Sequence, residues 1–142
     1  MLQQDKLIIF CDGGAINNPG PAGIGIVFCD ENRKPIKKVG QYIGEATNNQ
    51  AEYSAVILAL KIALNEFAAT DIQIYLDSEL IVQQINGFYK IKNEGLKPLH
   101  FKVKLLKMNF RQVLFDYIPR KKNKEADKLV KMAIKKGLAR QG

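Results

Sequence analysis

The sequence predicts an α/β fold in which a five-stranded mixed sheet carries helices on both faces. Two observations support this prediction. Three strand-like segments joined by short turns come first, which is typical of an antiparallel meander. Helical and strand-like segments alternate after them, and such crossings place strands parallel in one sheet. We therefore expect antiparallel pairing among strands one, two and three, and parallel pairing of strand one with four and of four with five.

The meander strands are expected at residues 6–12, 22–29 and 35–43. The first is an apolar run that ends at Asp12, and a turn rich in Gly, Asn and Pro connects it to the second. In the second strand, glycine alternates with isoleucine. These boundaries place Asp12 at the carboxyl end of its strand.

The remaining elements are expected as a helix at 49–67, a strand at 72–76, helices at 78–86 and 95–110, a strand at 112–118 and a helix at 123–136. Asn48 or Asn49 is expected to cap the first helix, with Glu52 in its first turn, where negative charge is favoured. Gly87 and Gly137 are expected to follow the ends of two helices.

The length of 142 residues suits one domain, so residues 1–142 are expected to form a single unit. The polar N-terminus does not resemble a signal peptide, and no apolar stretch reaches the length of a membrane span. We therefore expect a cytoplasmic monomer without a membrane partner. Cys11 and Cys29 would lie at opposite ends of a hairpin, so both are expected to be buried, reduced thiols.

Charge is divided unequally along the chain. Residues 1–89 carry 6 Lys and Arg against 10 Asp and Glu, whereas residues 90–142 carry 16 against 4. A basic half beside an acidic half suggests that one part holds a polyanion while metal ions act in the other. The alternative is a solvated basic surface without a partner.

Four acids occupy positions where buried apolar residues are expected. Asp12 and Asp77 end apolar strands, while Glu52 and Asp127 lie on the apolar stripes of helices. A carboxylate on a core-facing position is costly unless something compensates its charge. A pair of divalent cations is the simplest shared compensator, and it indicates phosphodiester chemistry. Taken singly, an Asp at a strand end is usually a turn or helix-cap residue, and a Glu in a first helical turn usually complements the helix dipole.

Four motifs occur in an order that resembles type 1 ribonuclease H, most closely its compact archaeal and bacterial members. They are Asp12-Gly13-Gly14 with Asn18-Pro19-Gly20-Pro21, Thr47-Asn48-Asn49-Gln50-Ala51-Glu52, Leu76-Asp77-Ser78-Glu79, and Pro119-Arg120 with Asn123 and Glu125-Ala126-Asp127. The resemblance covers about residues 6–134 and implies the ribonuclease H-like fold.

The resemblance implies cleavage of the RNA strand of RNA–DNA hybrids with two Mg²⁺ ions, for which Mn²⁺ is a possible substitute. Asp12, Glu52, Asp77 and Asp127 match the metal-binding acids of the family. The expected products carry 5′-phosphate and 3′-hydroxyl ends.

The resemblance also implies a set of residues that contact the substrate, namely Gly13, Gly14, Asn18, Thr47, Asn48, Asn49, Ser78 and Arg120. Within it, the three asparagines match positions beside the 2′-hydroxyl groups of the RNA, which distinguish RNA from DNA. Thr47 matches a position near a phosphate of the DNA strand. Turn formation and helix capping are the alternative roles of the asparagines.

The sequence departs from many family members in three respects. The loop before Asp127 contains no His, and Arg120 is expected to contact phosphate without shuttling protons. The single His, His100, is expected to be structural. A bulky basic protrusion is absent, so we expect Lys90, Lys92 and Lys97 to meet the DNA backbone in weak, salt-sensitive binding.

Three other functions remain open at this point. One is broader cleavage that includes double-stranded RNA, and another is a non-catalytic nucleic-acid-binding module on the same fold. A binding module gains nothing from clustered carboxylates near phosphates. An integrase- or resolvase-like nuclease shares the fold and metals, but is not expected to carry the Asn48-Asn49-Gln50-Ala51-Glu52 helix start.

Overall fold

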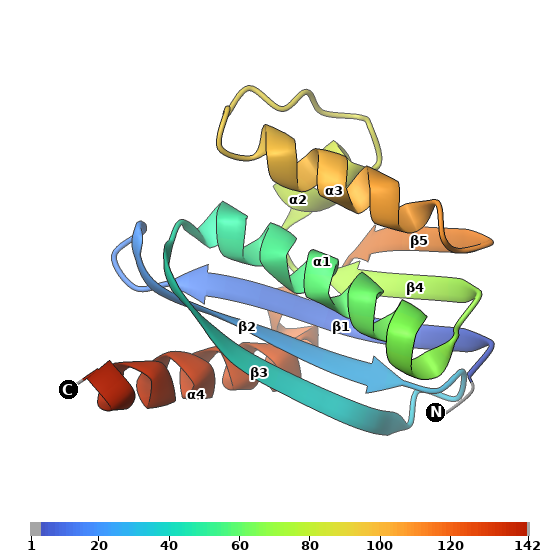
Figure 1. Ribbon diagram of the computed structural model, residues 1–142, viewed down its shortest axis with the longest axis horizontal. Helices are drawn as coiled ribbons and strands as arrows, with labels where there is room; N and C mark the ends of the chain where they lie inside the picture. Colours follow the sequence, from blue (N-terminus) through green and yellow to red (C-terminus); the bar gives the residue numbers. More distant parts are fainter. Residues whose placement is uncertain (1–3, 142) are drawn as a thin grey trace.

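The computed structural model describes residues 4–141, which form one five-stranded sheet with strand order β3-β2-β1-β4-β5. The strands are β1 (Lys6–Ala15), β2 (Gly20–Cys29), β3 (Pro35–Ala46), β4 (Asp71–Leu76) and β5 (Gln112–Tyr117). β1 pairs antiparallel with β2 and β2 with β3, whereas β1 with β4 and β4 with β5 are parallel. The predicted sheet and its strand order are confirmed (Figure 1).

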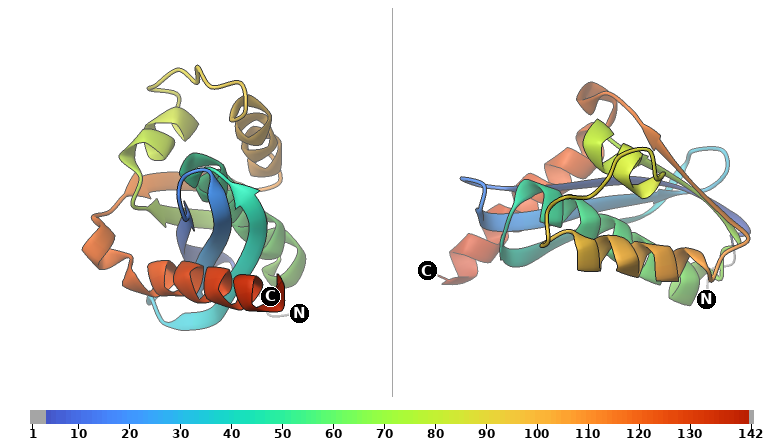
Figure 2. Two further views of the ribbon diagram at one scale, coloured as in Figure 1. Left: turned by 90° about the vertical axis from the view of Figure 1, so that its left-hand side faces the viewer. Right: turned by 90° about the horizontal axis from the view of Figure 1, so that it is seen from above.

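Helices cover both faces of the sheet, as predicted (Figures 1 and 2). They are α1 (Asn48–Phe67), α2 (Glu79–Ile85), α3 (Lys97–Lys107) and α4 (Lys124–Gln141), and a short 3-10 helix, η1 (Arg120–Lys122), precedes α4. α1 packs on β1 with α3 beside it, while α4 packs on β2 and β3. Among the described residues, no helix combines the length and apolar character that crossing a bilayer requires.

The main core lies between α1 and the sheet. Its largest fully buried side chains include Tyr53 and Phe67 of α1 and Phe28 of β2. The Phe28 and Phe67 rings stack with centroids 5.5 Å apart. Cys11 and Cys29 are buried free thiols, as predicted.

α1 begins differently from the prediction. Thr47 is its N-cap: the Thr47 hydroxyl accepts from the Gln50 amide at 3.1 Å, and the Gln50 side chain accepts from the Thr47 amide at 3.0 Å. This reciprocal capping box replaces the predicted cap at Asn48 or Asn49. Glu52 is the fifth residue of the helix and therefore lies beyond its first turn, contrary to the prediction.

α4 continues past Gly137 to Gln141, so the prediction that Gly137 stops the helix was wrong. A Cβ at Gly137 would lie 2.2 Å from the ring of Tyr42 on β3. The same close approach occurs at Gly25 on β2, where a Cβ would lie 2.1 Å from the carbonyl oxygen of Ala126. The glycines thus allow α4 to pack directly against the sheet.

β1 is longer than predicted and runs through Asp12 to Ala15, because it stays paired with β2 from Ile8 to Ala15. The parallel ladder between β1 and β4, in contrast, ends at Cys11 and Leu76. Asp12 therefore lies inside a strand, not at its end. It is the first residue beyond the ladder with β4, as Asp77 is the first beyond the end of β4.

Candidate active site

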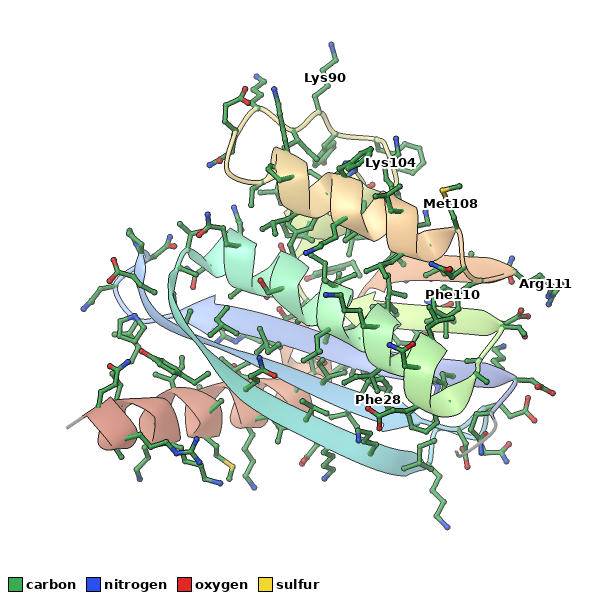
Figure 3. All side chains as sticks on the ribbon, in the orientation of Figure 1. Phe28, Lys90, Lys104, Met108, Phe110 and Arg111 are labelled. Atoms are coloured by element: carbon green, nitrogen blue, oxygen red, sulfur yellow. The ribbon has the colours of Figure 1, made fainter. Side chains whose placement is uncertain are left out.

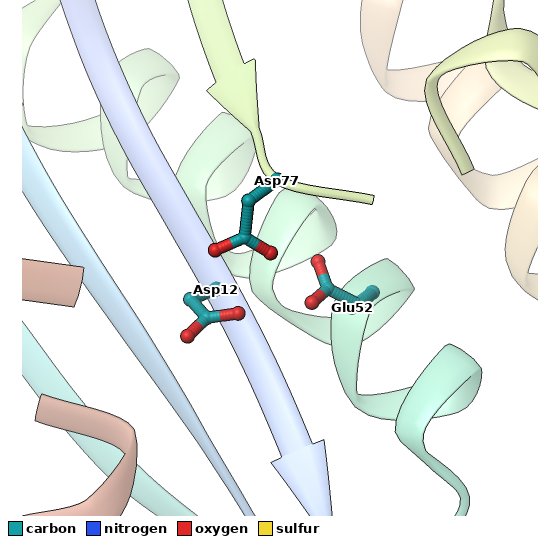
Figure 4. Close-up of side chains that lie close together, drawn as sticks. All are labelled: Asp12, Glu52 and Asp77. Atoms are coloured by element: carbon teal, nitrogen blue, oxygen red, sulfur yellow. The ribbon is translucent and has the colours of Figure 1, made fainter. Parts of the chain in front are cut away.

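Three carboxylates converge where the ladder between β1 and β4 ends. Asp12 comes from β1, Asp77 follows β4 and Glu52 comes from α1, and Figure 4 shows their carboxyl groups turned toward one another. One carboxylate oxygen of each lies within 4.8 Å of those of the other two. Asp12 and Glu52 are each only 6% exposed. The chain thus gathers three acids from segments far apart in sequence.

A glycine allows α1 to bring Glu52 this close. A Cβ at Gly13 would lie 2.3 Å from the backbone of Ala51, so no other residue fits there without displacing the helix. The Gly13 amide donates to Asp12 Oδ1 at 2.9 Å and to Glu52 Oε1 at 3.3 Å. This single N–H is shared by both acids, which leaves most of their negative charge uncompensated.

The electrostatics of the cluster follow from this geometry. Burial raises the pKa of Asp12 to about 7, and the nearby Asp77 and Asp127 carboxylates act in the same direction. Burial and the charge of Asp12 raise the pKa of Glu52 well above its ordinary value. The pKa of Asp77 is also raised by burial, although a hydrogen bond from Asn123 opposes the shift. The site therefore favours positive charge.

Glu52 Oε2 is buried and has no hydrogen-bond partner among the described residues. An unpartnered carboxylate oxygen inside a protein is costly, and a cation removes that cost. Asp12, Glu52 and Asp77 offer only oxygen atoms, which are the ligands that Mg²⁺ and Mn²⁺ prefer. The three residues fit a divalent metal ion.

Asp127, the fourth predicted acid, lines the same cavity from α4 but is paired differently. Its carboxylate accepts from Arg120 Nη2 at 3.3 Å and pairs with Lys131 Nζ at 3.1 Å. Burial acts to raise its pKa, but the Lys131 and Arg120 cations lower it below the ordinary value. The structure thus brings three of the four acids into one cluster and sets Asp127 at its rim with two cations.

The cavity that contains these acids has a volume of about 440 Å³. Six of the eight residues predicted to contact substrate contribute to its wall: Gly13, Gly14, Asn48, Asn49, Ser78 and Arg120. The Arg120 side chain is 74% exposed. Asn18 and Thr47 do not line the cavity.

The side chains of Asn18, Asn48 and Ser78 all make hydrogen bonds to backbone amides near the cavity. Asn18 Oδ1 accepts from the Asn48 amide, and Asn48 Oδ1 accepts from the Ala15 amide, both at 2.8 Å. These bonds join the β1–β2 turn to the start of α1. Ser78 caps α2 by accepting from the Ile81 amide at 3.3 Å. Asn18 and Asn48 therefore have a structural role at the turn, whereas the alternative capping role of Asn48 and Asn49 is taken by Thr47.

Asn123 lies directly beside the three acids. Asn123, which the sequence placed in the fourth motif and at a helix start without a role in the site, is 2% exposed, and its Nδ2 donates to both Cys11 O and Asp77 Oδ2. The sequence signal for this role was the position of Asn123, one helical turn before Asp127, where a buried amide needs hydrogen-bond partners.

His100 lies outside the cavity. Its Nε2 is 3.2 Å from Gln84 O and its ring lies edge-on to Tyr53, which agrees with a structural role.

Comparison with known proteins identifies the family. The model of a family described as reverse transcriptase-like matches residues 10–133. Ribonuclease HI of Halobacterium salinarum is 34% identical over 125 residues, which cover 88% of this chain and 62% of that protein. The crystal structure of LC11-RNase H1 in complex with RNA/DNA hybrid superimposes with a TM-score of 0.87 at 44% identity, covering 93% of this chain and 99% of that one.

The chain belongs to the type 1 ribonuclease H family. A bifunctional protein of Mycobacterium tuberculosis, Rv2228c, is 37% identical over 130 residues. This chain spans only 35% of that protein's length. The similarity of this chain to solved RNase H1 structures confirms the predicted fold and agrees with the expected resemblance to compact members of the family.

Proposed function

We propose that the protein is an endoribonuclease that hydrolyses the RNA strand of RNA–DNA hybrids in a reaction dependent on two divalent cations. The observation that carries this proposal is the cluster of Asp12, Glu52 and Asp77, whose ligand atoms lie within 4.8 Å of one another in a chain of this family. Mg²⁺ is the expected ion and Mn²⁺ a possible substitute. A monomeric, cytoplasmic enzyme formed by a single domain of residues 1–142 is part of the proposal.

Each acid has a proposed role. Asp12, Glu52 and Asp77 would form the main set of metal ligands, and Asp127, at the rim of the same cavity, would add a fourth carboxylate. When bound, the ions supply an activated water and neutralise the charge that develops on the leaving 3′ oxygen. The products would carry 5′-phosphate and 3′-hydroxyl ends.

For Asp127 to serve as a ligand, we propose that its carboxylate gives up its contact with Arg120 in favour of a metal ion. The ion pair with Arg120 is exposed and its distance is 3.3 Å, so it is weak enough to open. Arg120 is then free to contact a substrate phosphate at the cavity rim. We therefore propose that Arg120, in the loop before Asp127 that contains no His, alternates between this carboxylate and a substrate phosphate.

The asparagines offer a way to recognise RNA. Asn18 and Asn48 use their side-chain oxygens inside the protein, while no described residue accepts from their NH₂ groups. Asn49 makes no side-chain hydrogen bond within residues 4–141 and lies on the cavity wall. Three amide donors therefore remain available to hydroxyl oxygens, and 2′-hydroxyls are the groups that distinguish RNA from DNA. Thr47, Ser78 and the backbone of Gly13 and Gly14 complete the proposed contact set.

The second strand of the hybrid has a separate proposed surface. Asn49 borders both the main cavity and a neighbouring groove that Tyr89, Lys90 and Lys92 also line. Lys90 extends away from the sheet on the loop after α2 (Figure 3). Lysine side chains are long and flexible and bind phosphates mainly as point charges, so we expect hybrid binding to weaken steeply with salt.

The test is cleavage of end-labelled RNA–DNA hybrid, double-stranded RNA and double-stranded DNA with Mg²⁺, beside the Asp77→Asn variant. Cleavage of only the RNA in the hybrid, lost in the variant, supports the proposal. Additional cleavage of double-stranded RNA would broaden the substrate class. Tight binding without cleavage in Mg²⁺ or Mn²⁺ would make the protein a nucleic-acid-binding module and refute the catalytic role.

A further inference from the structure

No backbone pairing holds Asp12 and Asp77 at a fixed spacing. The hydrogen-bonded register of β1 and β4 ends at Cys11 and Leu76, one residue before each acid. Past that point β1 follows β2, while the chain after β4 turns into α2. Something other than the sheet must therefore set the distance between the two carboxylates.

Asn123 bridges the two strands at this point. Its Nδ2 donates to the carbonyl oxygen of Cys11 at 2.8 Å and to Asp77 Oδ2 at 3.2 Å. The Cys11 carbonyl belongs to the peptide unit that precedes Asp12, so the first bond fixes the backbone from which Asp12 projects. The second bond fixes the carboxylate of Asp77 directly.

The backbone of Asn123 extends the connection to α4. Its carbonyl accepts from the Asp127 amide at 3.1 Å, and its own amide donates to Arg120 O at 2.9 Å. One residue thus contacts the segments that carry Asp12, Asp77, Asp127 and Arg120. Because its side chain is only 2% exposed, water cannot substitute for these bonds.

The chemistry of the position requires a neutral group with two donors on one atom. A carboxamide nitrogen carries two N–H bonds, which match the two acceptors. A hydroxyl group donates only once, and a buried lysine would bring a positive charge that competes with a metal ion. Asparagine therefore positions the cluster without reducing its negative charge.

We propose that Asn123 is a positioning residue that sets the spacing of Asp12, Asp77 and Asp127 and so determines the affinity of the cluster for divalent cations. The inference rests on the proposed function, because it assumes that the cluster binds metal. Partners that hold metal-binding side chains change metal affinity about 10–100-fold when they are removed. We expect a weakening in that range.

The experiment measures Mn²⁺ binding by electron paramagnetic resonance of the free ion in the wild type, Asn123→Leu and Asn123→Ser. Asn123→Leu keeps the branching of the side chain, in a larger and wholly apolar form, and removes both donors, so its Kd should rise about 10–100-fold. Asn123→Ser keeps one donor in a smaller side chain, which fits without clashes, and its Kd should lie in between. In cleavage assays, the Mg²⁺ concentration for half-maximal rate should rise in parallel, while excess Mg²⁺ restores kcat and the KM for hybrid is unchanged.

Asn86→Leu is the matched control. Asn86 Nδ2 donates to Phe115 O at 3.1 Å, which joins α2 to β5 by the same kind of bond away from the cavity. This variant should lose stability without a change in metal affinity. An unchanged Kd in both Asn123 variants, or an equal change in Asn86→Leu, overturns the inference. A wild type that binds Mn²⁺ but cleaves nothing would instead refute the proposed function and leave the positioning role intact.

Discussion

Asp12→Asn should stabilise the metal-free protein while abolishing cleavage. The Asp12 side chain is 6% exposed, and its pKa rises from 3.8 to about 7 through burial and neighbouring carboxylates. Each pKa unit corresponds to about 1.4 kcal/mol, so ionised Asp12 costs the folded state up to about 4 kcal/mol above pH 7. Asparagine has almost the same shape, keeps the acceptor for the Gly13 amide and adds a donor that can reach Glu52.

An amide is also costly to bury, so only part of this energy is recovered. We expect the free energy of unfolding to rise by about 1–3 kcal/mol in EDTA, which corresponds to a Tm increase of roughly 3–5 °C for each kcal/mol. The assay is urea and thermal unfolding at pH 7.5 with EDTA or with saturating Mg²⁺. In Mg²⁺ the difference should shrink or reverse, because the wild type gains binding energy that the variant has lost.

Glu31→Gln is the control, since Glu31 is exposed in the turn between β2 and β3 and removing its charge should change stability by under about 0.5 kcal/mol. Two results would refute the reasoning about Asp12. One is a destabilised Asp12→Asn protein in EDTA, and the other is a stability difference that is the same with and without Mg²⁺. Full cleavage activity in the variant would separately remove Asp12 from the metal site.

The remaining predictions concern pH, the rim arginine and the Gly-Gly pair. Because the folded state binds protons on Asp12 and Glu52 that the unfolded chain releases, the metal-free protein should lose stability as pH rises from about 4 to 7. Urea midpoints without metal that stay flat across this range would contradict the assigned shifts. Arg120→Ala should slow turnover but lower the free energy of unfolding by under about 1 kcal/mol, and unchanged kinetics would remove its proposed role. Gly13→Ala should destabilise the protein by at least about 2 kcal/mol in urea unfolding. Gly14→Ala should cost far less, because a Cβ at Gly14 would lie 3.7 Å from its nearest neighbour. Equal losses of stability in the two variants would contradict the close approach at Gly13.

The sequence by itself determined the architecture and the acids. Apolar periodicity and turn residues are local properties, so they predicted five strands, their order and their directions, which the structure confirms. The cost of burying a carboxylate singled out Asp12, Glu52, Asp77 and Asp127 in the same way, because it depends on the residue and on the face that it occupies. The motif order then indicated the family, which the comparisons established.

Only the tertiary structure decided how these parts meet. The end of the ladder at Cys11 and Leu76 and the continuation of α4 past Gly137 depend on partners distant in the chain. The capping box, in contrast, joins Thr47 to Gln50 three residues later, and is a local signal that the prediction missed. Gly137 illustrates the reason: its sequence context matches a helix stop, but the ring of Tyr42 requires a glycine within the helix. The role of Asn123 was missed for the same reason, although the residue belongs to the fourth motif, since its bonds to Cys11 and Asp77 span 112 and 46 residues.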